Sequence, residues 1–111
     1  MSPEDQSRLS HILEAAQRIA SYLDGVSRSD FLKDGVRQDA VIRRVQIIGE
    51  AARHLSPEAL AAMPDFPARK ARGMRHILVH DYDDVDMGMV WDTACQDIPA
   101  LAKSVEAFLK R

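Results

Sequence analysis

Residues 36–55 read VRQDAVIRRVQIIGEAARHL, and this stretch decides the fold class. Its apolar residues recur at spacings of four and three, which predicts an amphipathic helix from about Val36 to His54: Val41, Val45, Ile48, Ala52 and Leu55, with Ile47 and Ala51 widening the apolar face. Gly49 inside this helix costs about 1 kcal/mol relative to alanine. A glycine is usually kept at such a position because another backbone approaches closely, so we expect an element to pack against Gly49.

Helices are also predicted on both sides of this stretch. Ser2 can cap a helix from about Pro3 to Leu23, which ends before Gly25, and a single turn or a loop follows from Ser27 to Asp34. A short helix opens at Ser56-Pro57-Glu58 and runs to about Met63. Two more are expected, from Ala68 to about Val79 and from Val85 to Leu109, the second kinked or divided by Pro99. No segment shows the alternation of a strand, which indicates an all-α, up-and-down bundle of four to five helices.

Composition indicates one globular domain over residues 1–111. The chain has 111 residues, of which 46% are hydrophobic and 29% charged, and a net charge of −2, which excludes a globally basic nucleic-acid coat protein. Cys95 is the single cysteine, so no internal disulfide can form, and we expect it to be packed within a helix. No apolar run is long enough to span a bilayer and the first residues lack the pattern of a signal peptide, so we expect a cytoplasmic protein without a membrane partner.

Basic residues gather in one segment of this balanced chain. Arg69, Lys70, Arg72 and Arg75 fall within one predicted helix that contains no acidic residue, and Asp81, Asp83, Asp84 and Asp86 follow. Such a run can be ordinary solvated surface. It can also be a phosphate-binding face, since four cations on about two helical turns attract a polyanion. In that second interpretation Arg69, Lys70 and Arg72 bind RNA.

Residues 75–82, RHILVHDY, combine an arginine, two histidines and a tyrosine. A zinc hydrolase would need glutamate after His76, where Ile77 stands, although the two histidines and an aspartate could still hold a metal. In metal-independent RNA cleavage, His80 would move a proton of the ribose 2′-hydroxyl or the leaving oxygen, and Arg75 would stabilise charge on the phosphorus. In a purely structural role, Arg75 and His80 would pin helix ends and Tyr82 would fill the edge of the core. These alternatives remain open on chemistry alone.

The spacing within this segment favours assembly of two chains. At about 100° per helical residue, Arg75 and His80 lie about 140° apart around a helix and do not share a face. A site that contains both therefore needs a loosened helix, an arginine that wraps around it, or a second copy of the chain across a symmetry axis.

Several blocks of the chain resemble HepT-like proteins of the HEPN superfamily. The signature of that family is an arginine, four residues, a histidine, one residue and a tyrosine. Arg75, His80 and Tyr82 match it. Further blocks follow in the family's order and spacing: 47–58 (IIGEAARHLSPE), 73–75 (GMR), 79–82 (VHDY), 90–91 (VW) and 98–101 (IPAL). The ordered set covers nearly the whole chain and is far more specific than the Arg-His-Tyr spacing alone.

The resemblance implies a homodimeric helical bundle that acts as the ribonuclease toxin of a type VII toxin–antitoxin pair. It implies a metal-independent endoribonuclease without a cofactor, with Arg75 and His80 as catalytic residues. It also implies an MntA-like nucleotidyltransferase antitoxin that transfers AMP onto Tyr82. His76 stands where the family most often has asparagine, which leaves open whether it takes an acid–base role or orients a phosphate. Gly49 and Glu50 also match family positions, and we expect them to support packing and the dimer.

A second function is compatible with the same resemblance. Some HEPN proteins accompany minimal nucleotidyltransferases as non-catalytic subunits that bind a nucleotide or substrate in the same basic cleft. The identity of a neighbouring nucleotidyltransferase gene would not separate this function from the toxin, whereas growth arrest that is lost on replacement of His80 would.

Overall fold

The computed structural model describes residues 2–75 and 86–110, and every regular element in these ranges is helical. The longer helices are α1 (Pro3–Leu23), α3 (Gly35–Arg53) and α7 (Ile98–Leu109). The shorter elements are α2 (Arg28–Phe31), α4 (Pro57–Ala62), α5 (Ala68–Gly73), α6 (Met87–Asp92) and the π-helical turn η2 (Thr93–Asp97), which joins α6 to α7. The predicted all-α class is confirmed.

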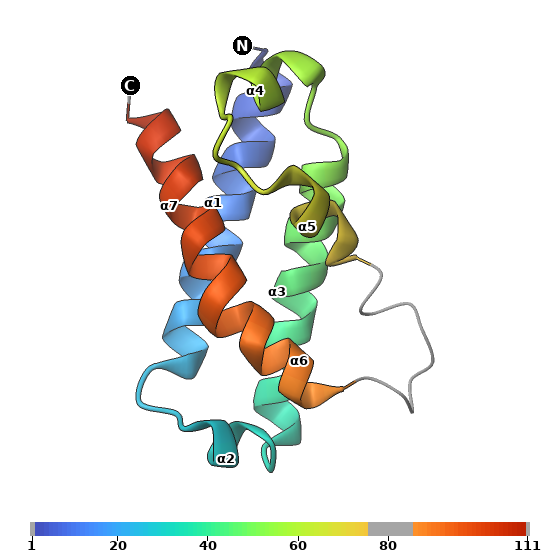
Figure 1. The fold of residues 1–111 in the computed structure, drawn as a ribbon. Coiled ribbons are helices and arrows are strands. Elements are labelled where there is room, and N and C mark those ends of the chain that lie inside the picture. Colours follow the sequence, from blue (N-terminus) through green and yellow to red (C-terminus); the bar gives the residue numbers. More distant parts are fainter. Residues whose placement is uncertain (1, 76–85, 111) are drawn as a thin grey trace.

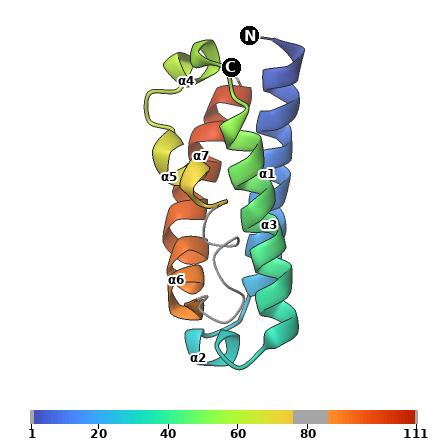
Figure 2. The same cartoon turned by 90° about the vertical axis from the view of Figure 1, so that its right-hand side faces the viewer.

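Three helical rods form the body of the bundle (Figure 1). α1 and α3 run antiparallel and are joined at one end through α2, and the continuous rod α6–η2–α7 packs along α1. α5 lies against α3, and α4 caps the end at which both chain termini lie (Figures 1 and 2). The predicted apolar face of α3 points into the core, where Val41, Val45, Ile48 and Ala52 are buried, whereas Ile47 and Ala51 are only partly covered.

Local capping explains where the helices begin. The Ser2 hydroxyl accepts a hydrogen bond from the Asp5 N–H at 3.1 Å, and the Ser56 hydroxyl accepts one from the Ala59 N–H at 3.1 Å. Both serines precede a proline at the first helical position, so the predicted starts of α1 and α4 are confirmed. The single turn expected between Ser27 and Asp34 is α2.

Phe31 holds this short helix in place. Its side chain is fully buried, and its ring centroid lies 5.4 Å from that of Trp91 in α6. An aromatic pair at this distance adds about 0.5–1.5 kcal/mol beyond the burial of its area. One aromatic residue thus secures an otherwise polar connection between α1 and α3.

The helix predicted from Ala68 to Val79 ends earlier in the structure than expected. α5 ends at Gly73, and Met74 and Arg75 form a turn in which the Met74 N–H bonds back to Lys70 and Ala71. Glycine is a poor residue for helix propagation, which is consistent with an end at this point. Arg75 therefore lies just beyond the helix, so the angle of about 140° that was predicted between Arg75 and His80 on one helix does not apply. Residues 76–79 lie outside the described ranges.

The interruption predicted near Pro99 is confirmed, and its form is a π-helical turn. Proline has no N–H to donate, and its ring would collide with the carbonyl group four residues earlier in a regular α-helix. η2 ends immediately before α7, in which Pro99 occupies the first turn. A π turn bonds five residues apart instead of four, which relieves the conflict without ending the rod. Of the last predicted helix, Val85 lies outside the described residues.

The membrane prediction can be compared with the described helices. None of them combines the length and the apolar character needed to cross a bilayer.

A buried carboxylate ties the start of α1 to the start of α4. Asp5 is only 1% exposed; it accepts hydrogen bonds from the Ser56 hydroxyl at 2.6 Å and from the Ser56 N–H at 3.0 Å. These two bonds, the hydroxyl first, lower the pKa of Asp5 from its ordinary value of 3.8 despite the opposing effect of burial. Ser56 thus caps α4 and at the same time binds α1, across 51 residues of sequence.

We expect Asp5→Ala to lower the free energy of unfolding at pH 7 by about 1–3 kcal/mol, the usual contribution of hydrogen bonds to a charged group. Because the pKa of Asp5 is lowered by folding, its contribution is fully present above the ordinary value and is lost as the pH falls through the lowered value. Urea unfolding of both proteins between pH 7 and pH 3 measures this. A deficit that stays constant over that range would contradict the assignment.

Candidate functional site

Gly49 brings the end of α5 onto α3. A β-carbon built at Gly49 would lie 2.5 Å from the backbone nitrogen of Arg75, closer than real β-carbons pack, and 3.0 Å from its α-carbon. The close backbone approach expected from the sequence is thus confirmed, and its partner is Arg75 itself. The position of this arginine relative to α3 depends directly on the missing side chain.

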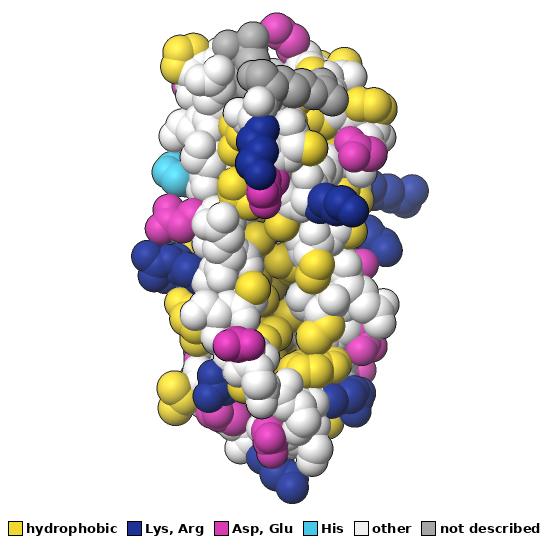
Figure 3. Space-filling view, turned by 90° about the vertical axis from the view of Figure 1, so that its left-hand side faces the viewer, with side chains coloured by type: hydrophobic (Ala, Val, Ile, Leu, Met, Phe, Trp, Pro, Cys, Tyr) yellow, Lys and Arg dark blue, Asp and Glu magenta, His cyan; other side chains and the backbone are white. Residues whose placement is uncertain are grey.

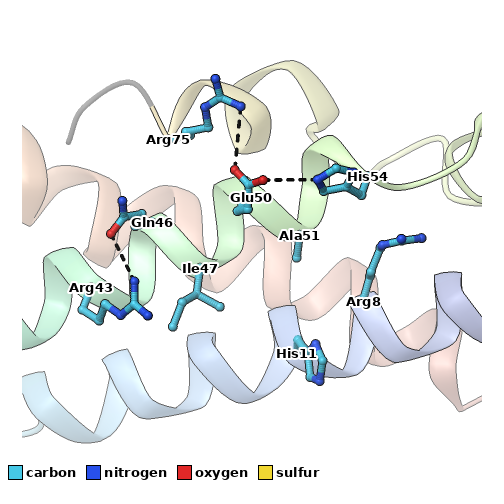
Figure 4. Close-up of a pocket in the computed structure, with 9 residues that line it drawn as sticks. All are labelled: Arg8, His11, Arg43, Gln46, Ile47, Glu50, Ala51, His54 and Arg75. Atoms are coloured by element: carbon cyan, nitrogen blue, oxygen red, sulfur yellow. Dashed lines mark hydrogen bonds and ion pairs between the residues drawn. The ribbon is translucent and has the colours of Figure 1, made fainter. Parts of the chain in front are cut away.

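Arg75 lies above Glu50, which also holds His54 (Figure 4). The Arg75 Nη1 is 3.7 Å from Glu50 Oε2, and His54 Nε2 is 3.2 Å from Glu50 Oε1. The Arg75 side chain is 31% exposed and that of Glu50 is 51% exposed. Pairs this exposed contribute at most about 1 kcal/mol to stability, so Glu50 adds little to the stability of the fold through these contacts.

These residues form one side of an open groove between α1 and α3. The groove has a volume of about 520 Å³, and its described lining comes from three segments, as Figure 4 shows: Arg8 and His11 from α1, Arg43, Gln46, Ile47, Glu50, Ala51 and His54 from α3, and Arg75 from the turn after α5. These residues include three arginines, two histidines and one glutamate. The arrangement is suited to hold an anion, since guanidinium groups donate to phosphate or carboxylate in pairs of hydrogen bonds.

The structure brings together only some of the predicted site residues. Arg75 lies in the groove, whereas Arg69, Lys70 and Arg72 lie exposed on α5, and Lys70 pairs with Asp97 at 3.2 Å. The RNA-binding role of these three residues stays a prediction. His76, His80 and Tyr82 lie outside the described residues, as do Asp81, Asp83 and Asp84.

The role expected for Glu50 differs from the one that the structure shows. We expected both Gly49 and Glu50 to serve packing and dimer support; Gly49 does pack, but the carboxylate of Glu50 is half exposed and pairs with Arg75 and His54 in the groove. The packing assigned to Glu50 is therefore wrong within this chain, because its position on α3 faces the groove and not the core.

The other cationic residues of the groove lie outside the Arg-His-Tyr motif of the sequence and were not predicted. Polar residues on α3 recur at spacings of three and four, which puts them on one face: Arg43, Gln46, Glu50 and His54. Arg8 and His11 stand three apart on α1. This spacing can be read from the sequence, but any amphipathic helix presents such a polar face to solvent. The polar faces of α1 and α3 line one groove only because the two helices pack against each other.

Cys95 is exposed, so the expectation that it is packed is wrong. It lines a second hollow, of about 320 Å³, between α1 and the η2–α7 segment, and Figure 3 shows hydrophobic side chains along this face. Partial desolvation, followed by repulsion from Asp92, raises the pKa of the Cys95 thiol. A raised pKa leaves less of the reactive thiolate at neutral pH.

The metal interpretation of the motif involves His76, His80 and neighbouring aspartates, which the structure does not describe. Within residues 2–75 and 86–110, no three histidine, cysteine or carboxylate side chains are grouped so that they could hold a metal ion.

Comparisons with known proteins agree on one family. The family model described as "Ribonuclease HepT-like" matches residues 12–108. The chain is 35% identical to a candidate RNase of Caldanaerobacter subterraneus subsp. tengcongensis, over 93% of this chain and 92% of that protein. It is 34% identical to a probable ribonuclease HepT of Thermococcus cleftensis, over 99% and 100% of the two chains. It is 32% identical to a candidate RNase of Methanocaldococcus jannaschii, over 96% and 98%. No solved structure matches.

We expect Gly49→Ala to destabilise the protein, although alanine is the better helix former by about 1 kcal/mol. The added methyl group would meet the backbone of Arg75, and overpacking of this kind costs about 1–3 kcal/mol. Thermal unfolding followed by circular dichroism measures the difference. Gly35→Ala is the matched control, because nothing lies within 4 Å of its added carbon. A Gly49→Ala protein that is more stable than the wild type would show that the contact does not constrain Arg75.

Proposed function

This chain belongs to the HepT-like ribonuclease family, and from that membership we propose that it is a metal-independent endoribonuclease toxin with Arg75 and His80 as its catalytic pair. The position of Arg75 is the observation that most directly supports the assignment. This arginine is partly exposed at the wall of a cationic groove, and its backbone rests on Gly49. An RNA phosphate could replace Glu50 as its partner without any change in the fold.

The proposed reaction is an internal transfer at phosphorus. The ribose 2′-oxygen attacks the neighbouring phosphate, the bond to the 5′-oxygen of the next nucleotide breaks, and the products are a 2′,3′-cyclic phosphate and a free 5′-hydroxyl. His80 takes the proton from the 2′-hydroxyl or gives one to the leaving oxygen. Arg75 neutralises the charge that grows on the phosphoryl oxygens. His76 orients the phosphate or shares the proton transfer.

The proposed active form is a homodimer in which two copies of the motif segment face one cleft. Two-fold symmetric dimers are the commonest assemblies of soluble proteins. Each protomer would bring its Arg75 and His80 to a shared cleft, and Gly49 would support this arrangement by keeping the turn after α5 close to α3.

Regulation by a partner is the second part of the proposal. An MntA-like nucleotidyltransferase antitoxin would transfer AMP from ATP onto the Tyr82 hydroxyl, with pyrophosphate as the leaving group. The added phosphate would give Arg75 an anion to hold, and the nucleotide would occupy space that the RNA needs. Both proteins would act in the cytoplasm, where the RNA substrates are.

Arg75→Ala and His80→Ala should each abolish RNA cleavage while the helix content stays unchanged. Loss of a charge-stabilising donor costs about 10²–10³-fold in rate, and loss of acid–base help costs about 10²–10⁴-fold. Gel analysis of a labelled RNA, with circular dichroism of each variant, measures both effects. Cleavage should persist in EDTA, leave a 2′,3′-cyclic phosphate and fail on an all-deoxy strand.

Two controls sharpen this experiment. A mixture of the two inactive variants should regain part of the activity if each site combines Arg75 of one protomer with His80 of the other. A strict need for an added divalent ion would contradict the metal-independent mechanism. RNA that is bound but never cut would instead favour the non-catalytic binding subunit.

Tyr82→Phe should keep at least part of the ribonuclease activity but escape neutralisation by the nucleotidyltransferase. Phenylalanine keeps the ring and removes the oxygen that accepts AMP. Intact mass spectrometry after incubation with the partner and ATP should show one or more added AMP units on the wild-type protein and none at residue 82 of the variant. Neutralisation of the wild type without any change in mass would mean that the partner inhibits by binding alone.

A further inference from the structure

The groove between α1 and α3 contains cations that the proposed chemistry does not use. Arg8 lies on α1 and Arg43 on α3, and neither belongs to the Arg-His-Tyr motif. His11 adds a further nitrogen donor from α1. These side chains line the same hollow as Arg75, so whatever occupies the groove lies directly beside the proposed catalytic arginine.

Two acidic groups near the groove, Glu50 and Asp5, are already engaged, whereas Glu4 lines a neighbouring hollow together with Arg8 and His11. Glu50, the one carboxylate among the described lining residues, contacts Arg75 and His54. Asp5 lies one helical turn before Arg8 and interacts with it electrostatically, but both of its oxygens accept hydrogen bonds from Ser56. Arg43 donates to the neutral amide of Gln46 at 3.4 Å. The described groove therefore has an excess of positive charge available for an anion.

The shape of the groove favours a strand over a single ion. Its lining on α3 runs from Arg43 to His54, which is about 16 Å at 1.5 Å per residue. Cations occur at both ends and Ile47 and Ala51 lie between them, both partly buried (Figure 4). A volume of about 520 Å³ lies within the range of about 300–1,000 Å³ that is typical of pockets for organic ligands. Charged ends and an apolar middle suit successive phosphates with a base or sugar between them.

We infer that this groove binds the single-stranded RNA segment next to the cut, with Arg8 and Arg43 contacting its phosphates. The inference rests on the proposed ribonuclease function, and it assigns the substrate path to the α1–α3 groove in preference to the exposed face of α5. Arg69, Lys70 and Arg72 lie on a short helix, none of them lines the groove, and Lys70 is paired with Asp97. Guanidinium groups in a concave site can contact several phosphates of one strand at once.

The test compares charge removal inside and outside the groove. The double variant Arg8→Gln/Arg43→Gln removes two groove cations. Arg18→Gln/Arg53→Gln removes the same charge from the same two helices at positions that do not line it. Fluorescence anisotropy with a labelled 2′-O-methyl RNA, which cannot be cut through its 2′-oxygen, gives the Kd of each protein between about 50 and 200 mM KCl.

The groove variant should bind this RNA about tenfold or more weakly, since each lost arginine removes hydrogen bonds to a charged group. Its plot of log Kd against log salt should be shallower by about 1.4, because each phosphate contact on a single strand contributes about 0.7. The off-groove variant should stay within about twofold of the wild type at equal salt. Arg8→Lys/Arg43→Lys should recover most of the salt slope, since it restores the charge.

Three results would overturn the inference: a groove variant that binds RNA like the wild type, an off-groove variant that loses as much affinity, or poly-glutamate that competes as well as RNA of equal charge. The last would identify a surface for an acidic protein. If the double variant does not fold, the single variants Arg8→Gln and Arg43→Gln answer the same question. The two proposals can fail separately. If the wild-type protein binds RNA through the groove but does not cut it, the proposed ribonuclease function is wrong and the binding site stands. If the wild-type protein cuts RNA and the groove variants bind it equally well, the assignment of the groove is wrong and the ribonuclease function stands.

Discussion

The contact between Gly49 and the backbone of Arg75 is the constraint on which the site depends. It joins the last third of α3 to the turn that follows α5, with no space for even a methyl group between them. The same contact sets the Arg75 guanidinium above Glu50, one residue further along α3. Two neighbouring residues of one helix thus contact the arginine: Gly49 meets its backbone, and Glu50 pairs with its side chain.

Much of the fold follows from local signals. The start of α1 and of α4 could be predicted because a serine cap and a proline act within one helical turn. The end of α5 could not, because the residues up to Val79 keep a helical pattern and the chain leaves the helix at Gly73, where it meets α3. Cys95 was misplaced for a related reason: it stands in the π turn, where the α-helical period no longer tells which side chains face the core.

In the site, too, local features could be predicted from the sequence and long-range contacts could not. Arg75 was identified by its motif, and the close approach at Gly49 was predicted from the cost of a glycine inside a helix. Arg8 and Arg43 were not identified, because they are 35 residues apart in sequence and become neighbours of one groove only when α1 packs on α3. Long-range packing turns two ordinary solvent-facing helix surfaces into one concave, positively charged surface.

The π turn determines which side chains of the α6–η2–α7 rod face the core. A residue inserted into a regular α-helix rotates everything beyond it by about 100°, which would turn the apolar face of α7 out of the core. η2 absorbs the extra residue within Thr93–Asp97, so Val90 before it and Ile98 and Leu101 after it are all buried. The wider hydrogen-bonding of this one turn therefore keeps the apolar faces of α6 and α7 on the same, core-facing side of a single rod.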